Sequence, residues 1–505
     1  MTSHIHVSAK KNGVHYAEVY TPQRKGGKKV NDPIYLGKVI DLEKGIFFNR
    51  KRGFFRYTID NGFETCDFDK SELGMNQSVE KCILDFGAVY LLWQTLKMTG
   101  YLDIFRELCP KHSDSLLALL FYRIQQSGGY SMANEWLAGS YANVLFPKAQ
   151  LTSQRISELL KELGDESVFR SFFTSYLKAE IPKDRRVGIL VDSTGLPNSI
   201  DTYLTAINNH NGHISNETRL LLVVDKQNGK PLFFRYNPGN VPDVSTLQAT
   251  ILEMKAMRVD IGMAILDAGY FSEKNIEALG SVGIPFLTRL APNRKLYKQL
   301  VAEYHTQALD ESNVVKYGGR LVGIVRVPVT LPSDLDGYAY VAVDYDRRYQ
   351  EWKSYTQGAI EDRASVEERR KNTLTHGFFV LICSEMVKPT EILPLYYTRQ
   401  IVEQIFDVSK NDIDLLPLRV HSEETLRGHL MLVFLASLVY LFLNDKLKAT
   451  KFNAANALLI SRNLKCKVFD NEILVKEPVK TMNDIAKAVG FSFPKKIVEG
   501  NEYGN

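Results

Sequence analysis

The order of apolar strands and helices between residues 187 and 290 most constrains what this 505-residue chain can fold into. Apolar runs at Val187–Asp192 and Ile261–Asp267 predict two buried strands, and each run ends in a carboxylate. Between them, residues 219–236 predict a hairpin around the turn K-Q-N-G-K, and residues 244–257 predict a helix. A second helix and a strand, I-P-F-L-T-R-L, follow.

This order is that of a mixed five-stranded sheet whose first three strands are antiparallel, the RNase H-like arrangement. Asp192 and Asp267 both close strands, and open sheets expose ligand-binding groups at strand ends. Either aspartate alone is as easily explained by a turn or a helix cap, but the pair within this order favours a catalytic site. Asp225 ends a strand in a tight turn, so we interpret it as structural.

The first segment of the chain is basic and rich in short strands. Residues 1–60 hold twelve Lys or Arg and five Asp or Glu. Aromatic residues alternate with a set of cations that we expect to contact a DNA backbone: Arg24, Lys25, Lys28, Lys29, Arg50, Lys51 and Arg52. The alternative is a small β-meander with a basic outer face.

The sequence predicts an α/β multidomain chain with six regions. The basic β-rich region covers residues 1–75, and a helical domain with expected DNA contacts covers 76–182. The catalytic core occupies 183–293 and 386–450, on either side of a β-rich insertion at 294–385. The C-terminal region, 451–505, is a candidate for dimerisation.

Cysteine usage and hydropathy indicate a cytoplasmic protein. The five cysteines are odd in number, widely spaced and without a C-x-x-C pair, which argues against a zinc site and a disulfide framework. No secretory signal follows Met1. The longest apolar run, Leu430 to Leu443, has fourteen residues, so we expect a buried core helix and no membrane partner.

The stretch from Tyr396 to Lys410 predicts an amphipathic helix with one polar stripe. At about 100° per residue, Tyr396, Arg399, Glu403 and Lys410 fall within about 60° of one another. A surface helix with ordinary i,i+4 charge pairs would show the same pattern. Asp407 lies on the same side one turn after Glu403, so it is a rival for any role given to Glu403.

Asp192, Asp267 and Glu403 together predict a site for two Mg²⁺ ions, for which Mn²⁺ can substitute. Two such ions would clamp the attacking and leaving oxygens of an in-line displacement at a phosphodiester. Arg399 and Lys410, on the face of Glu403, would contact DNA phosphates. Tyr396 would hydrogen-bond a phosphate or pack beneath the site.

Three motifs carry a family resemblance. The pattern Y-x(2)-R-x(3)-E-x(6)-K is matched by Tyr396, Arg399, Glu403 and Lys410, after I-L-V-D-S-T-G at Asp192 and I-L-D-A-G-Y-F-S at Asp267. Over roughly residues 185–445 the chain resembles bacterial insertion-sequence DDE transposases of the Y-R-E-K class.

The resemblance implies an RNase H-like enzyme that acts in the bacterial cytoplasm, at the nucleoid. Such an enzyme binds the terminal inverted repeats of its element, cleaves at the ends and transfers the 3′-OH ends to target DNA. It would work as a homodimer in a synaptic complex with double-stranded DNA.

Members of the family that have a β insertion use that insertion to hold a flipped base or a hairpin end. Trp352, which lies in the insertion, is therefore a candidate for base stacking. The alternative is a half-buried packing tryptophan. Two other functions stay open: a metal-dependent nuclease that does not transfer strands, and a DNA-binding regulator that has lost catalysis.

Overall fold

The computed structural model describes residues 3–9, 15–25, 28–31, 33–66, 80–210, 213–361, 365–367 and 373–498. The chain divides into two compact units. The first is Met1–Lys81 with Phe469–Glu472, and the second is Cys82–Val468 with Ile473–Asn505. The predicted DNA contacts of Arg24, Lys25, Lys28 and Lys29 lie outside the side chains that the structure describes.

The first unit is built on a six-stranded antiparallel sheet in the order β1-β2-β5-β6-β7-β8. Its strands are β1 His4–Ala9, β2 His15–Tyr20, β5 Ile34–Asp41, β6 Ile46–Asn49, β7 Gly53–Thr58 and β8 Gly62–Thr65, with the separate hairpin β3 Pro22–Lys25 and β4 Lys28–Asn31. Alternate residues such as Ala17, Val19, Phe47 and Phe55 are buried against one another, as a period of two requires. The predicted N-terminal β region is confirmed.

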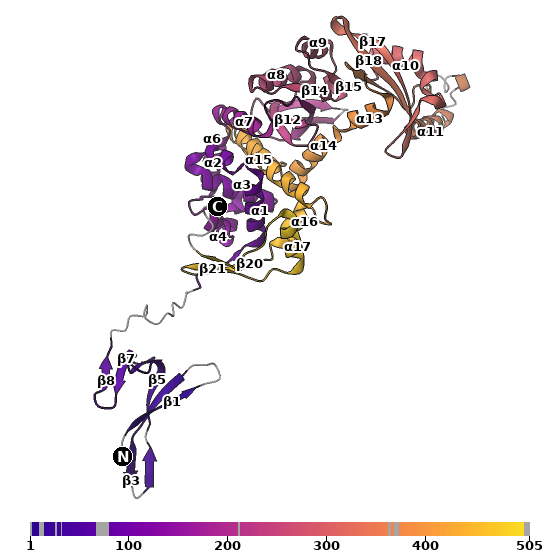
Figure 1. Ribbon diagram of the computed structural model, residues 1–505. Helices are drawn as coiled ribbons and strands as arrows, with labels where there is room; N and C mark the ends of the chain where they lie inside the picture. The colour runs from indigo at the N-terminus through magenta and orange to yellow at the C-terminus, as the bar shows by residue number, and fades with distance from the viewer. Residues whose placement is uncertain are drawn as a thin grey trace. The chain divides into compact units, whose positions relative to one another are not determined.

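The second unit begins with a strand and a group of helices, which confirms the predicted helical region (Figure 1). The elements are β9 Cys82–Asp85, α1 Gly87–Thr99, α2 Leu102–Leu108, α3 Ser113–Gln125, α4 Ala133–Gly139, α5 Ala142–Leu145, α6 Ser153–Leu163 and α7 Glu166–Glu180. Side-chain caps start the last two: Thr152 accepts from the Arg155 N–H and Asp165 from the Ser167 N–H.

A large mixed sheet follows, and its first part has the expected strand order. The elements are β10 Val187–Pro197, β11 Ala206–His210, β12 His213–Asp225, β13 Pro231–Pro238, α8 Asp243–Ala256, β14 Ile261–Leu266, α9 Glu273–Ser281 and β15 Phe286–Leu290. The strands lie in the order β13-β12-β10-β14-β15. β12 is antiparallel to β13 and β10, whereas β10, β14 and β15 are parallel.

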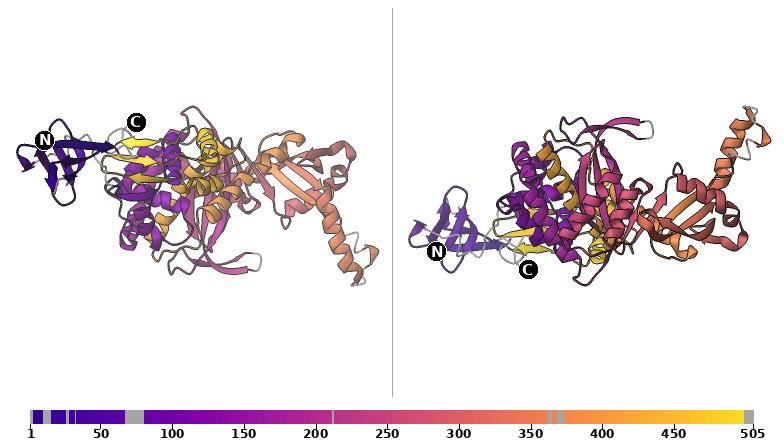
Figure 2. Two further views of the ribbon diagram at one scale, coloured as in Figure 1. Left: turned by 90° about the horizontal axis from the view of Figure 1, so that it is seen from below. Right: turned by 90° about the horizontal axis from the view of Figure 1, so that it is seen from above.

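The predicted β-rich insertion continues the same sheet. Strand β15 pairs with β19, and β18, β17 and β16 follow beyond it. The elements are α10 Lys295–Ala308, β16 Val314–Tyr317, β17 Arg320–Leu331, β18 Leu335–Asp344, α11 Tyr345–Glu361 and β19 Phe378–Cys383. Among its described residues the insertion also contains the helices α10 and α11, and α11 projects from it in both views of Figure 2. The apolar pattern did not predict α11, because its surface is mostly polar.

The chain then returns through helices to the helical region. The elements are α13 Pro389–Tyr397, α14 Gln400–Asp407, the π-helical turn Val408–Asp412, α15 Glu423–Leu447, α16 Ala454–Ser461, β20 Lys465–Val468, β21 Glu472–Val475, α17 Lys480–Val489 and β22 Lys496–Val498. β9 joins β20, β21 and β22 in a second sheet. The finer domain boundaries predicted within this unit stay predictions.

Helix α15 is the buried core helix that Leu430 to Leu443 predicts. Among the described residues it alone is long and apolar enough to cross a membrane, but 83% of its most apolar window is buried inside the structure. It packs against α6, α3 and α1 of the helical region. Its Phe434 also meets Phe173 of α7 and Phe234 of β13, so the helices and the mixed sheet share one core.

Candidate active site

The sheet brings Asp192 and Asp267 to one edge. Val191 and Leu266 are partners in the parallel pairing of β10 and β14, so the aspartates that follow them lie side by side. Asp192 remains within β10, where its carboxylate accepts the Ser193 N–H at 2.8 Å, whereas Asp267 lies just beyond the end of β14. The site is thus set by two buried strands that the apolar runs predict.

Arg399 joins these aspartates to Glu403. Its guanidinium lies 3.0 Å from Asp267, 3.5 Å from Asp192 and 3.0 Å from Glu403. The side chains of Arg399 and Asp192 are 15% and 14% exposed, whereas Glu403 is 54% exposed. Three carboxylates from three elements therefore converge on one internal cation.

Burial and charge shift the protonation equilibria here. The pKa of Asp192 is raised to about 6, and burial is the largest cause. Arg399 and the Ser193 N–H oppose this rise, while Asp267 and Glu403 contribute to it. Burial lowers the pKa of Arg399, but Asp267, Tyr396, Asp192 and Glu403 together raise it above its usual value. The guanidinium thus stays charged among the carboxylates.

Lys410 reaches the same strand at a different point. Its ammonium donates to the Thr194 hydroxyl at 2.6 Å, two residues after Asp192. Burial lowers the pKa of Lys410, while Asp407 and Glu217 oppose that shift. Asp407 is exposed, and its negative charge favours the charged form of Lys410. Glu403 is the residue of α14 that pairs with Arg399.

The predicted continuous helix from Tyr396 to Lys410 is wrong. Helix α13 ends at Tyr397, α14 begins at Gln400, and the chain widens into a π-helical turn at Val408. The Thr398 hydroxyl donates to the Leu395 carbonyl at 2.7 Å, a local bond that competes with continued helix. Across these breaks Tyr396 and Glu403 both still contact Arg399, and Lys410 reaches Thr194 from the π-helical turn.

Tyr396, at the end of α13, is more deeply buried than the other three motif residues. Tyr396 is 4% exposed, and its ring lies 5.8 Å from the Arg399 guanidinium. Burial raises its pKa far above the usual range. Tyr396 is thus packed in the core beside Arg399, and its predicted contact with a DNA phosphate stays a prediction.

The donor chemistry suits a hard divalent cation, because three carboxylates already surround a positive charge. All three lie within 3.5 Å of the Arg399 guanidinium. Across the described parts of the chain, no three His, Cys, Asp or Glu side chains stand close enough to hold a metal ion directly. An ion at this site would therefore take the place of the guanidinium.

Two other predicted residues lie away from the carboxylates. Trp352 is on α11 and 46% exposed, with its ring 6.1 Å from that of Tyr349, and base stacking on it stays a prediction. Asp225 is 1% exposed; Arg185 donates to both its carboxylate oxygens at 2.7 Å, in keeping with a structural role.

A polar network beside Asp192 was not expected from the sequence. Arg219 of β12 donates to Ser193 at 2.7 Å and to both oxygens of Asp243 at 3.0 and 2.8 Å. This fork ties α8 to the strand that carries Asp192. The available signal was a charged residue, Arg219, directly before the apolar run that starts at Leu220.

The family model for the transposase DDE domain matches residues 183–439. A search among curated proteins found no match. One similar solved structure is a cryo-EM structure of a piggyBac transposase synaptic complex with hairpin DNA, at 10% identity. The alignment covers 69% of this chain and 70% of that one, with a TM-score of 0.37.

Proposed function

The chain belongs to the family of proteins with a transposase DDE domain, and from this premise we propose that it is the DNA transposase of a bacterial insertion sequence. It would bind the terminal inverted repeats of its element, cleave there and join the 3′-OH ends to target DNA. The observation that carries this proposal is the convergence of Asp192, Asp267 and Glu403 on one cation at the edge of the mixed sheet.

The roles within the site follow from donor chemistry. Asp192, Asp267 and Glu403 would hold two Mg²⁺ ions, which neutralise phosphate charge and make the attacking water or hydroxyl more acidic when bound. Lys410 would orient the DNA backbone as a point charge beside Thr194. Arg399, once released from the carboxylates, would grip a phosphate with its planar fork. We propose a homodimer as the form that pairs two ends.

The first test removes one carboxylate at a time. With Mg²⁺ and a pre-cut duplex carrying the inverted repeats that flank the gene, Asp192→Ala, Asp267→Ala and Glu403→Ala should each lower strand joining by at least about 1,000-fold. End binding in a gel shift should remain, because the substituted groups carry negative charge. Asp407→Ala is the matched control on α14 and should retain joining.

The outcomes separate the rival functions. Hydrolysis of the ends without joining would identify a nuclease, and end binding without cleavage by the unaltered protein would identify a regulator. Loss of joining in Asp407→Ala, with joining retained in Glu403→Ala, would reverse the assignment of the third carboxylate.

A further inference from the structure

The N-terminal sheet carries a groove of about 720 Å³. Its lining includes Tyr16, Tyr35, Lys38 and Phe48 together with the turn from Arg50 to Arg52. Four cations and four aromatic rings line the groove, and the lining contains no Asp or Glu. This volume falls within the range of sites that enclose an organic group of nucleotide size.

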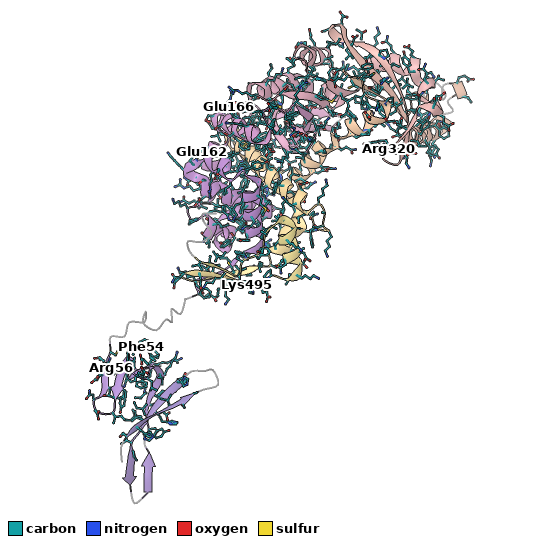
Figure 3. All side chains as sticks on the ribbon, in the orientation of Figure 1. Phe54, Arg56, Glu162, Glu166, Arg320 and Lys495 are labelled. Atoms are coloured by element: carbon teal, nitrogen blue, oxygen red, sulfur yellow. The ribbon has the colours of Figure 1, made fainter. Side chains whose placement is uncertain are left out.

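Strand register explains why rings and charge gather there. Tyr16 of β2 is the partner of Lys38 of β5, Lys38 is the partner of Phe48 of β6, and Phe48 is the partner of Phe54 of β7. Cross-strand partners present their side chains to the same face of a sheet, so these residues form one row across four strands. The Phe48 and Phe54 rings lie 4.8 Å apart, and Figure 3 marks Phe54 on this unit.

A fixed turn places the cations at the end of this row. The Asn49 side chain accepts the Lys51 N–H at 3.1 Å and the Arg52 N–H at 2.9 Å. Arg50, Lys51 and Arg52 are exposed, and the Arg52 guanidinium lies 4.1 Å from the centre of the Phe63 ring. Among the ion pairs of the described residues, none uses Lys38, Arg50 or Lys51. Their charge is available to an anion.

Aromatic rings in one groove with cations that form no ion pair within the described part of the chain match an unpaired nucleic acid strand. Bases of a single strand expose their faces and stack on aromatic side chains, while the phosphates lie against Lys and Arg. A duplex hides its base faces and offers this groove only its phosphates. Tyr35 is 53% exposed, so its ring is open to such a base.

We propose that the groove binds single-stranded DNA, with bases on the aromatic rings that line it, Tyr35 among them, and phosphates on Lys38 and the turn Arg50–Arg52. The choice of DNA over RNA rests on the proposed function, in which strands are exposed when an element end is cut.

The test uses the full chain and a fluorescein-labelled 15-nucleotide oligothymidylate, read by fluorescence anisotropy. Tyr35→Ala should weaken binding about tenfold, because one stacked base is lost. Lys51→Ala should weaken binding and reduce the slope of log K against log salt by about 0.7. Tyr349→Ala, at an exposed tyrosine of α11, and Lys44→Ala, at a lysine paired with Asp41, should leave the affinity unchanged.

The proposal is overturned if Tyr35→Ala binds the oligonucleotide as the unaltered chain does. It is also overturned if Tyr35→Ala weakens binding of a 15-base-pair duplex by the same factor as binding of the oligothymidylate. A third contrary result is an oligouridylate of equal length that binds the unaltered chain more tightly than the oligothymidylate does. Strand joining by the unaltered protein tests the proposed function separately, so either proposal can fail while the other holds.

Discussion

At the residue scale, Arg399 is the least expected feature of the site. The motif spacing assigned it to a DNA phosphate, but its guanidinium lies among Asp192, Asp267 and Glu403. Apolar patterns and residue spacing identified the two strand ends and the helix that carry these side chains, because strand and helix periods are local. They do not reveal which of several oppositely charged groups will pair, since that depends on burial that only the folded chain defines.

Removing the guanidinium should increase the affinity for a divalent ion. Arg399→Ala, without DNA, is expected to bind Mn²⁺ about tenfold more tightly, because charge-assisted hydrogen bonds of roughly 1.5–3 kcal/mol no longer compete. Electron paramagnetic resonance of free Mn²⁺ measures this directly. Arg399→Lys keeps the charge and should lie near the unaltered protein; equal affinity in all three proteins would contradict the competition.

At the element scale, helices α6 and α15 cross with their backbones in contact. A Cβ on Gly428 would lie 1.8 Å from the Leu160 carbonyl oxygen, and one on Gly164 would lie 2.2 Å from the Glu424 carbonyl oxygen. The sequence predicted the helical domain over residues 76–182, in which α6 lies, and the core helix at Leu430 to Leu443. It did not predict their crossing, or that the insertion joins the main sheet through β19, because pairing between distant segments leaves no local period.

The crossing predicts a position-specific cost. Gly428→Ala should lower the free energy of unfolding by about 3 kcal/mol, since neither carbonyl nor helix can move without repacking. The matched control is Gly358→Ala in α11, where an added Cβ meets nothing within 4 Å. That change should raise helix stability by about 0.5–1 kcal/mol. Urea unfolding gives the free energy of unfolding of each variant. Similar free energies for Gly428→Ala and Gly358→Ala would refute the close crossing.

At the scale of the second unit, a buried polar network connects the helical region to the chain after the candidate site. Arg123 of α3 pairs with Asp414 and donates to the carbonyls of Ile413 and Gly128 at 3.0 and 3.1 Å. His429 of α15 bonds Tyr130 at 2.6 Å and the Leu415 carbonyl at 3.2 Å. Burial lowers the pKa of His429 to about 4, with a smaller contribution from Arg123.

This histidine should make stability depend on pH. Its folded pKa is below the unfolded value of about 6.5, so the unfolded chain binds the extra proton and stability falls as pH drops from about 6.5 towards 4. The expected contribution between pH 7 and pH 5 is about 2 kcal/mol. Urea unfolding at pH 7 and pH 5 measures this difference in the free energy of unfolding. In His429→Gln the difference should be smaller by about 2 kcal/mol. An unchanged difference would exclude His429 as its source.

The pairing of β15 with β19 has a mechanical consequence. Thr288 of β15 donates to the Asp267 carbonyl at 3.1 Å and is the partner of Ile382 of β19, which continues through β18 and β17 to β16. Backbone hydrogen bonds along this path are stiff, unlike a loop hinge. A force on the outer strand of the insertion, β16, is therefore transmitted through one continuous hydrogen-bonded sheet to the backbone at Asp267.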